Sequence, residues 1–145
     1  TFQPLPRPGV DFIVPYPAAD AFVRQIEQTL EPLVTGDTFS VLLIPMKTAR
    51  FSRPLFRAPK TGFALGVGIL RRLPDDAQAV AQALAYNRWL FDQARDIGGT
   101  HYPVGALQLD REDWKRLYGA AFSRLHDAKC RFDPDNVFAG GPDIF

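Results

Sequence analysis

The order of strand-like and helix-like patterns in this sequence predicts an α+β fold of the ferredoxin-like type: an antiparallel βαββαβ sheet with its helices on one face, plus a helical C-terminal extension. Three observations predict it. Two long stretches have the helical period of 3.6 residues, each of them follows a short apolar run, and the remaining apolar runs fall where this plan needs its other strands.

The first strand and helix are predicted near the start of the chain. Residues 11–16, DFIVPY, form an apolar run closed by prolines, which is typical of a strand near a sheet edge or end. From Ala18 the period becomes helical, Gly36 supplies a stop signal, and Pro32 should end or kink the last turn. The apolar positions of this helix are Ala19, Phe22, Val23, Ile26, Leu30 and Leu33.

Two strands are predicted in the middle of the chain, separated by a loop at residues 45–61. Residues 39–44, FSVLLI, are continuously apolar, as expected of a strand covered on both faces. Residues 63–70 instead alternate between bulky side chains and the nearly bare positions of Ala64, Gly66 and Gly68. A bare strand face lets another group approach closely. We favour a helix packed on this face, and a flat ligand ring is the alternative.

The second helix and the last strand follow. Asp75 begins the helix, Gln78 completes a capping box, and Gly98 lies just beyond its end. Asn87 falls on the apolar stripe, so its amide should bond a buried partner, for which backbone is the favoured choice. Residues 101–104 then form the fourth strand.

A further helix should form the C-terminal extension. Asp110 is placed to cap it, and residues 132–136, FDPDN, supply the turn chemistry that ends it. Its predicted apolar stripe is Trp114, Leu117, Ala121, Leu125 and Ala128.

Composition excludes several classes of protein. With 145 residues, 46% of them hydrophobic, the chain can bury the core of one ordinary domain. A formal net charge of +1 gives no field that would attract nucleic acid or an anionic membrane, and we expect neither as a partner. The one cysteine, Cys130, excludes an internal disulfide. No apolar run reaches the roughly 20 residues of a membrane span.

Few residues suggest chemistry by themselves. His126 and Cys130 lie four residues apart, but only His101 remains as a further soft ligand, so we expect no metal site. The loop at residues 45–61 carries five basic and no acidic side chains around two phenylalanines, a pattern that could bind nucleic acid. We favour a solvated rim or a contact with an acidic neighbouring domain. The residue patterns alone therefore indicate a ferredoxin-like domain without a reaction.

Several motifs resemble a known family. Residues 87–104, NRWLFDQARDIGGTHYPV, are followed by Trp114, Tyr118-Gly119, Lys129, Phe132-Asp133-Pro134 and a final Asp143-Ile144-Phe145. Together they resemble the C-terminal signature of cytokinin dehydrogenase-like flavoenzymes, of the vanillyl-alcohol oxidase superfamily. The opening PGVDFIVP resembles this family's Pro-Trp-Leu-Asn-apolar-Phe-Val-Pro strand. The resemblance is collinear over about residues 7–145, which makes it more specific than any single motif.

The resemblance implies an FAD-dependent oxidoreductase that oxidises an amine or alcohol carbon of a small-molecule substrate by hydride transfer to the flavin. FAD would be held mainly by an N-terminal FAD-binding domain of the same polypeptide. Residues 1–109 would form a ferredoxin-like substrate (cap) domain portion, and residues 110–145 a helix and tail that pack on the FAD domain. The family's catalytic acidic residues lie upstream of Thr1, so no catalytic residue is assigned, and we expect this chain to be inactive alone.

The resemblance also implies residues near the flavin. Tyr102 matches the family's strand tyrosine that faces the flavin. Pro142 stands where a flavin-contacting glutamine is expected, so that side-chain contact cannot be made, although Gly140 and Gly141 could still offer backbone groups to the flavin. A half-buried strand aromatic would explain Tyr102 equally well.

On the substrate side, the implied residues are Gly9, Asp11, His101 and Tyr102. Gly9 replaces a pocket tryptophan of the plant enzymes and Asp11 replaces their asparagine. Both departures argue against an adenine-type cytokinin as the substrate.

Two other hypotheses stay open from the residues. One is a stand-alone ferredoxin-like module for small-molecule binding or dimerisation, without redox activity, and the other is an RNA-binding module that uses the basic loop. The chain begins at Thr1 without an initiator methionine. We interpret it as a piece of a longer protein, although removal of a methionine before Thr1 explains this feature equally well.

Overall fold

The computed structural model describes residues 5–30, 38–138 and 144–145. The chain divides into two compact units, which we describe separately. The sheet unit is Thr1–Phe51 with Ala58–Leu107, and the C-terminal unit is Ser52–Arg57 with Gln108–Phe145. The elements are β1 (Val10–Pro15), α1 (Tyr16–Thr29), β2 (Thr38–Met46), the 3₁₀ turn η1 (Thr48–Arg50), β3 (Ala64–Arg72), α3 (Ala77–Asp96), β4 (Thr100–Gly105), α4 (Arg111–Tyr118) and α5 (Ala121–Phe132).

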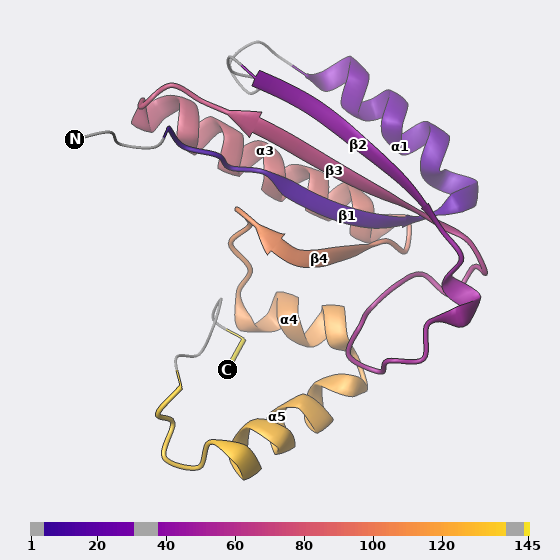
Figure 1. Ribbon diagram of the computed structural model, residues 1–145, viewed down its shortest axis with the longest axis vertical. Coiled ribbons are helices and arrows are strands. Elements are labelled where there is room, and N and C mark those ends of the chain that lie inside the picture. Colours follow the sequence, from indigo (N-terminus) through magenta and orange to yellow (C-terminus); the bar gives the residue numbers. More distant parts are fainter. Residues whose placement is uncertain (1–4, 31–37, 139–143) are drawn as a thin grey trace. The chain divides into compact units, whose positions relative to one another are not determined.

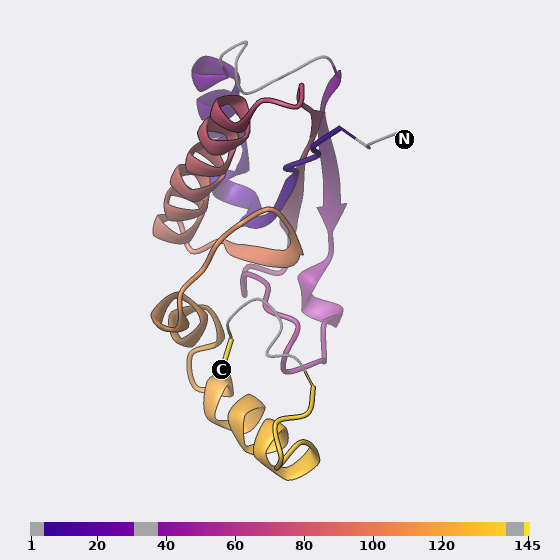
Figure 2. The ribbon, with the colours of Figure 1, turned by 90° about the vertical axis from the view of Figure 1, so that its left-hand side faces the viewer.

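The sheet unit has the ferredoxin-like arrangement that the sequence predicts. Its strands lie in the order β2-β3-β1-β4, and every neighbouring pair is antiparallel (Figure 1). Both α1 and α3 lie against the same face of this sheet (Figure 2). We call this the helix face. The predicted fold class is therefore confirmed.

Alternation along the strands decides which side chains enter the core. Phe12 of β1 points to the helix face, where its ring lies 5.9 Å from Phe22 of α1. The register pairs Phe12 with Val67, and Val67 is buried as well. The opposite face carries Gly66 and Gly68 of β3, together with Asp11 and Ile13 of β1. We call it the glycine face.

The first helix begins earlier and ends earlier than the periodicity suggests. It starts at Tyr16 with a proline in its first turn and no side-chain cap, and it ends at Thr29. Its buried residues, Ala19, Phe22 and Ile26, keep the predicted spacing. The expected stop signals Pro32 and Gly36, and the stripe residue Leu33, lie outside the described residues.

The second strand differs from its prediction. It was expected to be covered on both faces, yet β2 is an edge strand of the sheet. Leu42, Leu43 and Ile44 are consequently about half exposed. A continuous apolar run is typical of buried strands, but periodicity carries no information about which strand stands at an edge.

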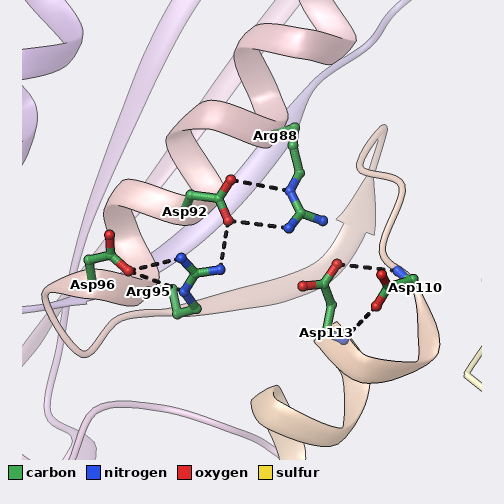
Figure 3. Close-up of polar contacts among 6 residues, drawn as sticks. All are labelled: Arg88, Asp92, Arg95, Asp96, Asp110 and Asp113. Atoms are coloured by element: carbon green, nitrogen blue, oxygen red, sulfur yellow. Dashed lines mark hydrogen bonds and ion pairs between the residues drawn. The ribbon is translucent and has the colours of Figure 1, made fainter.

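The cap of α3 lies one residue later than predicted. Asp76, rather than Asp75, is the N-cap, and its carboxylate accepts hydrogen bonds from the backbone nitrogens of Gln78 (2.7 Å) and Ala79 (3.0 Å). Further along α3, Asp92 binds Arg88 and Arg95, which also pairs with Asp96 (Figure 3). These pairs are partly exposed, so each contributes little to stability.

In the described residues of the C-terminal unit there are two helices, whereas the sequence predicts one. Asp110 caps α4 in a capping box with Asp113, which confirms the predicted start (Figure 3). The helix stops at Tyr118 because Gly119 has a φ of +53°, a backbone conformation that glycine adopts readily. The predicted end is confirmed, since α5 finishes at Phe132 and Asp133 then accepts hydrogen bonds from the backbone of Val137 and Phe138.

A buried polar clamp joins α3 to the start of β1 and the end of β4. Asn87, with 0% of its surface exposed, donates to the carbonyls of Pro8 (3.2 Å) and Ala106 (2.7 Å). The predicted role of Asn87 as a bridge to backbone is thus confirmed. Arg71 donates to the same Pro8 carbonyl (3.0 Å), to Ala83 (3.2 Å) and to the Asn87 side-chain oxygen. Burial lowers the pKa of Arg71 to about 10, so the group remains a cation at neutral pH.

Replacing Asn87 tests this clamp. We expect Asn87→Leu to lower the free energy of unfolding by about 2–4 kcal/mol, because buried carbonyls and the Arg71 cation lose a partner. The measurement is urea denaturation. The matched control is Gln93→Ala on the same helix, which removes only a part-buried bond to Gln25 and should cost less than about 1 kcal/mol. An equal decrease in the free energy of unfolding of the two variants would show that the clamp stabilises the fold no more than the part-buried Gln93 bond does.

Candidate functional site

The candidate site lies at the centre of the glycine face, where β1 pairs with both of its neighbours. Asp11 stands opposite Gly68 of β3 and opposite Tyr102 of β4. Its side chain leans over Gly68: a Cβ atom added at Gly68 would lie 2.6 Å from the Asp11 Oδ1 atom. Tyr102 is 43% exposed on the same face. The register therefore brings a carboxylate and an aromatic ring together.

Burial changes the acidity of this carboxylate. The pKa of Asp11 is raised above its ordinary value because its surroundings disfavour the charged form. The half-exposed apolar side chains nearby on this face are Leu42, Ile44 and Leu70. A hydrogen-bonding group amid apolar surface, beside an aromatic ring, suits a flat ligand that carries one hydrogen-bond donor.

The bare positions of β3 are not covered by the helix that the sequence predicts but by side chains of neighbouring strands. A helix was expected on this face, but both helices of the sheet unit, α1 and α3, lie on the other one (Figure 2). The glycines are instead approached by neighbouring side chains of the sheet itself. A Cβ at Gly66 would meet Met46 Cε at 2.9 Å, and one at Gly68 would meet Asp11. The prediction of a helix on the glycine face is thus wrong.

The side chain of His101 lies on the opposite face of the sheet from the side chains of Asp11 and Tyr102. Being one residue before Tyr102, its side chain points to the helix face, where it is 4% exposed and lies near the rings of Phe12 and Phe91. Its Nδ1 atom lies 3.0 Å from the Asp11 backbone oxygen. Burial lowers the pKa of His101, which favours the neutral ring. The side chain of His101 can therefore influence the glycine face only through the Asp11 backbone.

Gly9 lies just before β1, where two backbones come close. A Cβ at this position would lie 2.9 Å from the carbonyl oxygen of Ile69. The Gly9 oxygen in turn accepts a hydrogen bond from the Ala106 nitrogen at 2.7 Å. The close packing of the two backbones therefore requires glycine at this position, which is also next to the candidate site. The predicted flavin-side positions Gly141 and Pro142 lie outside the described residues.

The sequence patterns did not reveal a pocket that opens beside Gly9. It has a volume of about 390 Å³ and is lined by Arg7, Gly9, Thr38, Ser40, Leu70, Arg71 and Arg72. Thr38 pairs with Arg72 and Ser40 with Leu70, so these four side chains share the glycine face. Once the register of β2 and β3 is known, the alternation of side chains along each strand is enough to predict that these four residues share a face.

The described part of the chain offers neither a cluster of metal ligands nor a helix able to cross a membrane. No group of three or more His, Cys, Asp or Glu side chains there could hold a metal ion. The Cys130 sulfur and the His126 Nδ1 atom are 3.8 Å apart on exposed positions of α5. Among the described helices, none is both long and apolar enough to cross a membrane.

Comparison with known proteins gives a family and relatives of this chain. Residues 3–145 match the family model described as "Cytokinin dehydrogenase 1, FAD and cytokinin binding". The chain is 30% identical to "Uncharacterized oxidoreductase ORF5 in fasciation locus" of Rhodococcoides fascians over 94% of its own length and 30% of that protein. It is 31% identical to "Cytokinin dehydrogenase 8" of Oryza sativa subsp. indica over 91% of its own length and 28% of that protein. The chain thus spans less than a third of these relatives.

Gly68→Ala tests the contact between Gly68 and Asp11. We expect the new methyl group to turn the carboxylate toward water and so to lower the raised pKa of Asp11. An NMR titration of the Asp11 carboxyl carbon measures it. Gly66→Ala is the matched control, because the closest contact of its methyl group would be the flexible end of Met46, and its contacts with Ile44 would be 3.4 Å long. The same pKa in wild type and Gly68→Ala would contradict the contact.

The raised pKa of Asp11 also predicts a pH dependence of stability. The folded state holds this proton more tightly than the unfolded state, so Asp11 costs stability as pH rises through its pKa. Asp11→Asn should therefore raise the free energy of unfolding at pH 7, and this gain should vanish below the unfolded pKa of about 3.9. Urea denaturation at several pH values measures it. A gain that persists unchanged at pH 3 would show that the charge is not its cause.

Proposed function

The chain belongs to the family of FAD- and cytokinin-binding domains of cytokinin dehydrogenases, and we propose that it forms the substrate-side part of an FAD-linked oxidoreductase. The proposed reaction is the oxidation of an amine or alcohol carbon of a small molecule. Because the chain covers 30% and 28% of two relatives, we assign the binding of most of FAD to another domain of the same polypeptide.

The glycine face fits one side of a flat ring better than it fits a phosphate group. Gly66 and Gly68 lie within β3 and not at the turn from a strand into a helix, where glycines cradle phosphates. The half-exposed Tyr102 ring on β4 and the half-exposed apolar side chains Leu42 and Ile44 on β2 flank the bare positions of β3, and together they give a surface that a ring system can cover. When bound, FAD would supply the two-electron acceptor for the oxidation.

The pairing of Asp11 with Tyr102 carries this proposal. In it, the Asp11 carboxylate accepts a hydrogen bond from the N–H or O–H group of the substrate and so fixes the orientation of the carbon to be oxidised. The Tyr102 ring lies against the flat part of the substrate or of the flavin and excludes water from it, and its hydroxyl group donates a hydrogen bond to the same molecule. Neither residue is assigned as the base that removes a proton.

Gly9 supports a substrate different from that of the plant enzymes. A side chain at this position would collide with the Ile69 carbonyl, so no aromatic group can stack on the substrate from here without a shift of backbone. Together with a carboxylate at Asp11, this supports a substrate other than an adenine-type cytokinin. We propose a smaller molecule with a hydrogen-bond donor next to the oxidised carbon.

Turnover of the full-length flavoprotein tests this proposal. We expect Tyr102→Phe to lower kcat/KM roughly fivefold to tenfold, as for the loss of one hydrogen bond, and Asp11→Asn to lower it about 100-fold through misorientation of the substrate. The matched control is Tyr86→Phe. Tyr86 belongs to α3, and its hydroxyl group forms a hydrogen bond of 2.9 Å with Thr29. This variant should keep wild-type turnover.

The absorbance spectrum of the bound flavin gives a second readout for the same variants. Tyr102→Phe should shift its long-wavelength band, whereas Tyr86→Phe should leave the band in place. Wild-type turnover together with an unchanged spectrum in both Tyr102→Phe and Asp11→Asn would refute the assignment of the glycine face to the substrate side.

A further inference from the structure

The pocket beside Gly9 differs from the rest of the glycine face in its charge. Three of its lining residues are arginines, Arg7, Arg71 and Arg72, and two are hydroxyl residues, Thr38 and Ser40. None of the described residues that line it is acidic. Positive charge and hydroxyl donors around one concave surface favour a bound anion.

The arginines have different roles in this pocket. Arg71 lines the pocket, but its side chain points to the helix face, where its buried guanidinium group donates to Pro8 and to α3. Its charge therefore lies on the far side of the sheet from the pocket. Arg7 and Arg72 are exposed, and their guanidinium groups can turn toward a ligand. A guanidinium group binds a carboxylate or a phosphate through two parallel hydrogen bonds. Arg7 and Arg72 thus supply the charged donors of the pocket.

The pocket lies next to the proposed substrate site along β3. Leu70 lines it and is two residues along β3 from Gly68, over which the Asp11 carboxylate lies. Two residues of a strand span about 7 Å. Arg72 is four residues from Gly68, about 13 Å along the strand, so an extended small molecule can reach from Asp11 across Leu70 to Arg72.

We propose that this pocket binds an anionic end, a carboxylate or a phosphate, of a small molecule whose apolar body lies over Leu70. The identification of this molecule as the substrate rests on the proposed function, whereas the binding of an anion does not. The inferred substrate class is then a compound with a donor group at the oxidised carbon and an acidic group at its other end.

Binding of simple anions to the full-length protein with FAD bound tests the proposal. The probes are inorganic phosphate and benzoate, with benzamide as the neutral counterpart of benzoate, and isothermal titration calorimetry at constant ionic strength gives the Kd. We expect phosphate, benzoate or both to bind, and benzamide to bind more weakly than benzoate. Arg72→Gln should weaken the binding roughly fivefold to tenfold, because it removes a charged donor.

Arg50→Gln is the matched control, since Arg50 is also exposed but belongs to η1 and does not line the pocket. Binding by benzoate alone identifies a carboxylate site and binding by phosphate alone a phosphate site, and either supports the proposal. Absence of binding by both anions overturns it. So does an affinity that Arg72→Gln leaves unchanged, or that Arg50→Gln lowers equally.

These outcomes are distinguishable from failure of the proposed function. A protein that binds no anion but whose turnover depends on Tyr102 refutes only the anion pocket. A full-length protein that binds benzoate through Arg72 but contains no flavin refutes only the oxidoreductase.

Discussion

The register of β1 between β3 and β4 is the constraint on which the candidate site depends. It places Asp11 opposite Gly68 on one side and opposite Tyr102 on the other. A slip by one residue would move Asp11 into the helix-covered core and Phe12 onto the glycine face. The bonds from Asn87 and Arg71 to the Pro8 carbonyl hold the chain just before this strand, so a buried polar network specifies the register together with the apolar pattern.

The order of elements could be predicted from sequence because each transition has a local cause. A change in the period of the apolar residues marks where a strand becomes a helix. Asp110 stands just before an apolar helical stripe and caps that helix, and Asn87 stands on such a stripe and bonds buried backbone. The side chain of His101 shows the limit of such reasoning. Neighbouring strand residues point to opposite faces, so a motif that contains both His101 and Tyr102 places only one of them at the site.

Other features depend on interactions that no local pattern contains. The apolar run of β2 is typical of a buried strand, and only the sheet order makes it an edge. The apolar stripe continues past Gly119, although the positive φ there separates α4 from α5. The arginine pocket requires the pairing of Thr38 with Arg72, which becomes visible only when the strands are aligned. The flavin was inferred from the resemblance to a family and not from any single residue.

The Asp11 carboxylate unites these observations, because its partial burial is unfavourable for folding and useful for binding. The most direct measurement is a crystal structure of the full-length protein with FAD and an oxidisable substrate bound. We expect the substrate to lie between the flavin ring and the glycine face, within hydrogen-bond distance of Asp11 and in contact with Tyr102. A flavin ring and substrate that both lie away from this face, with Asp11 and Tyr102 touching neither, would contradict the assignment.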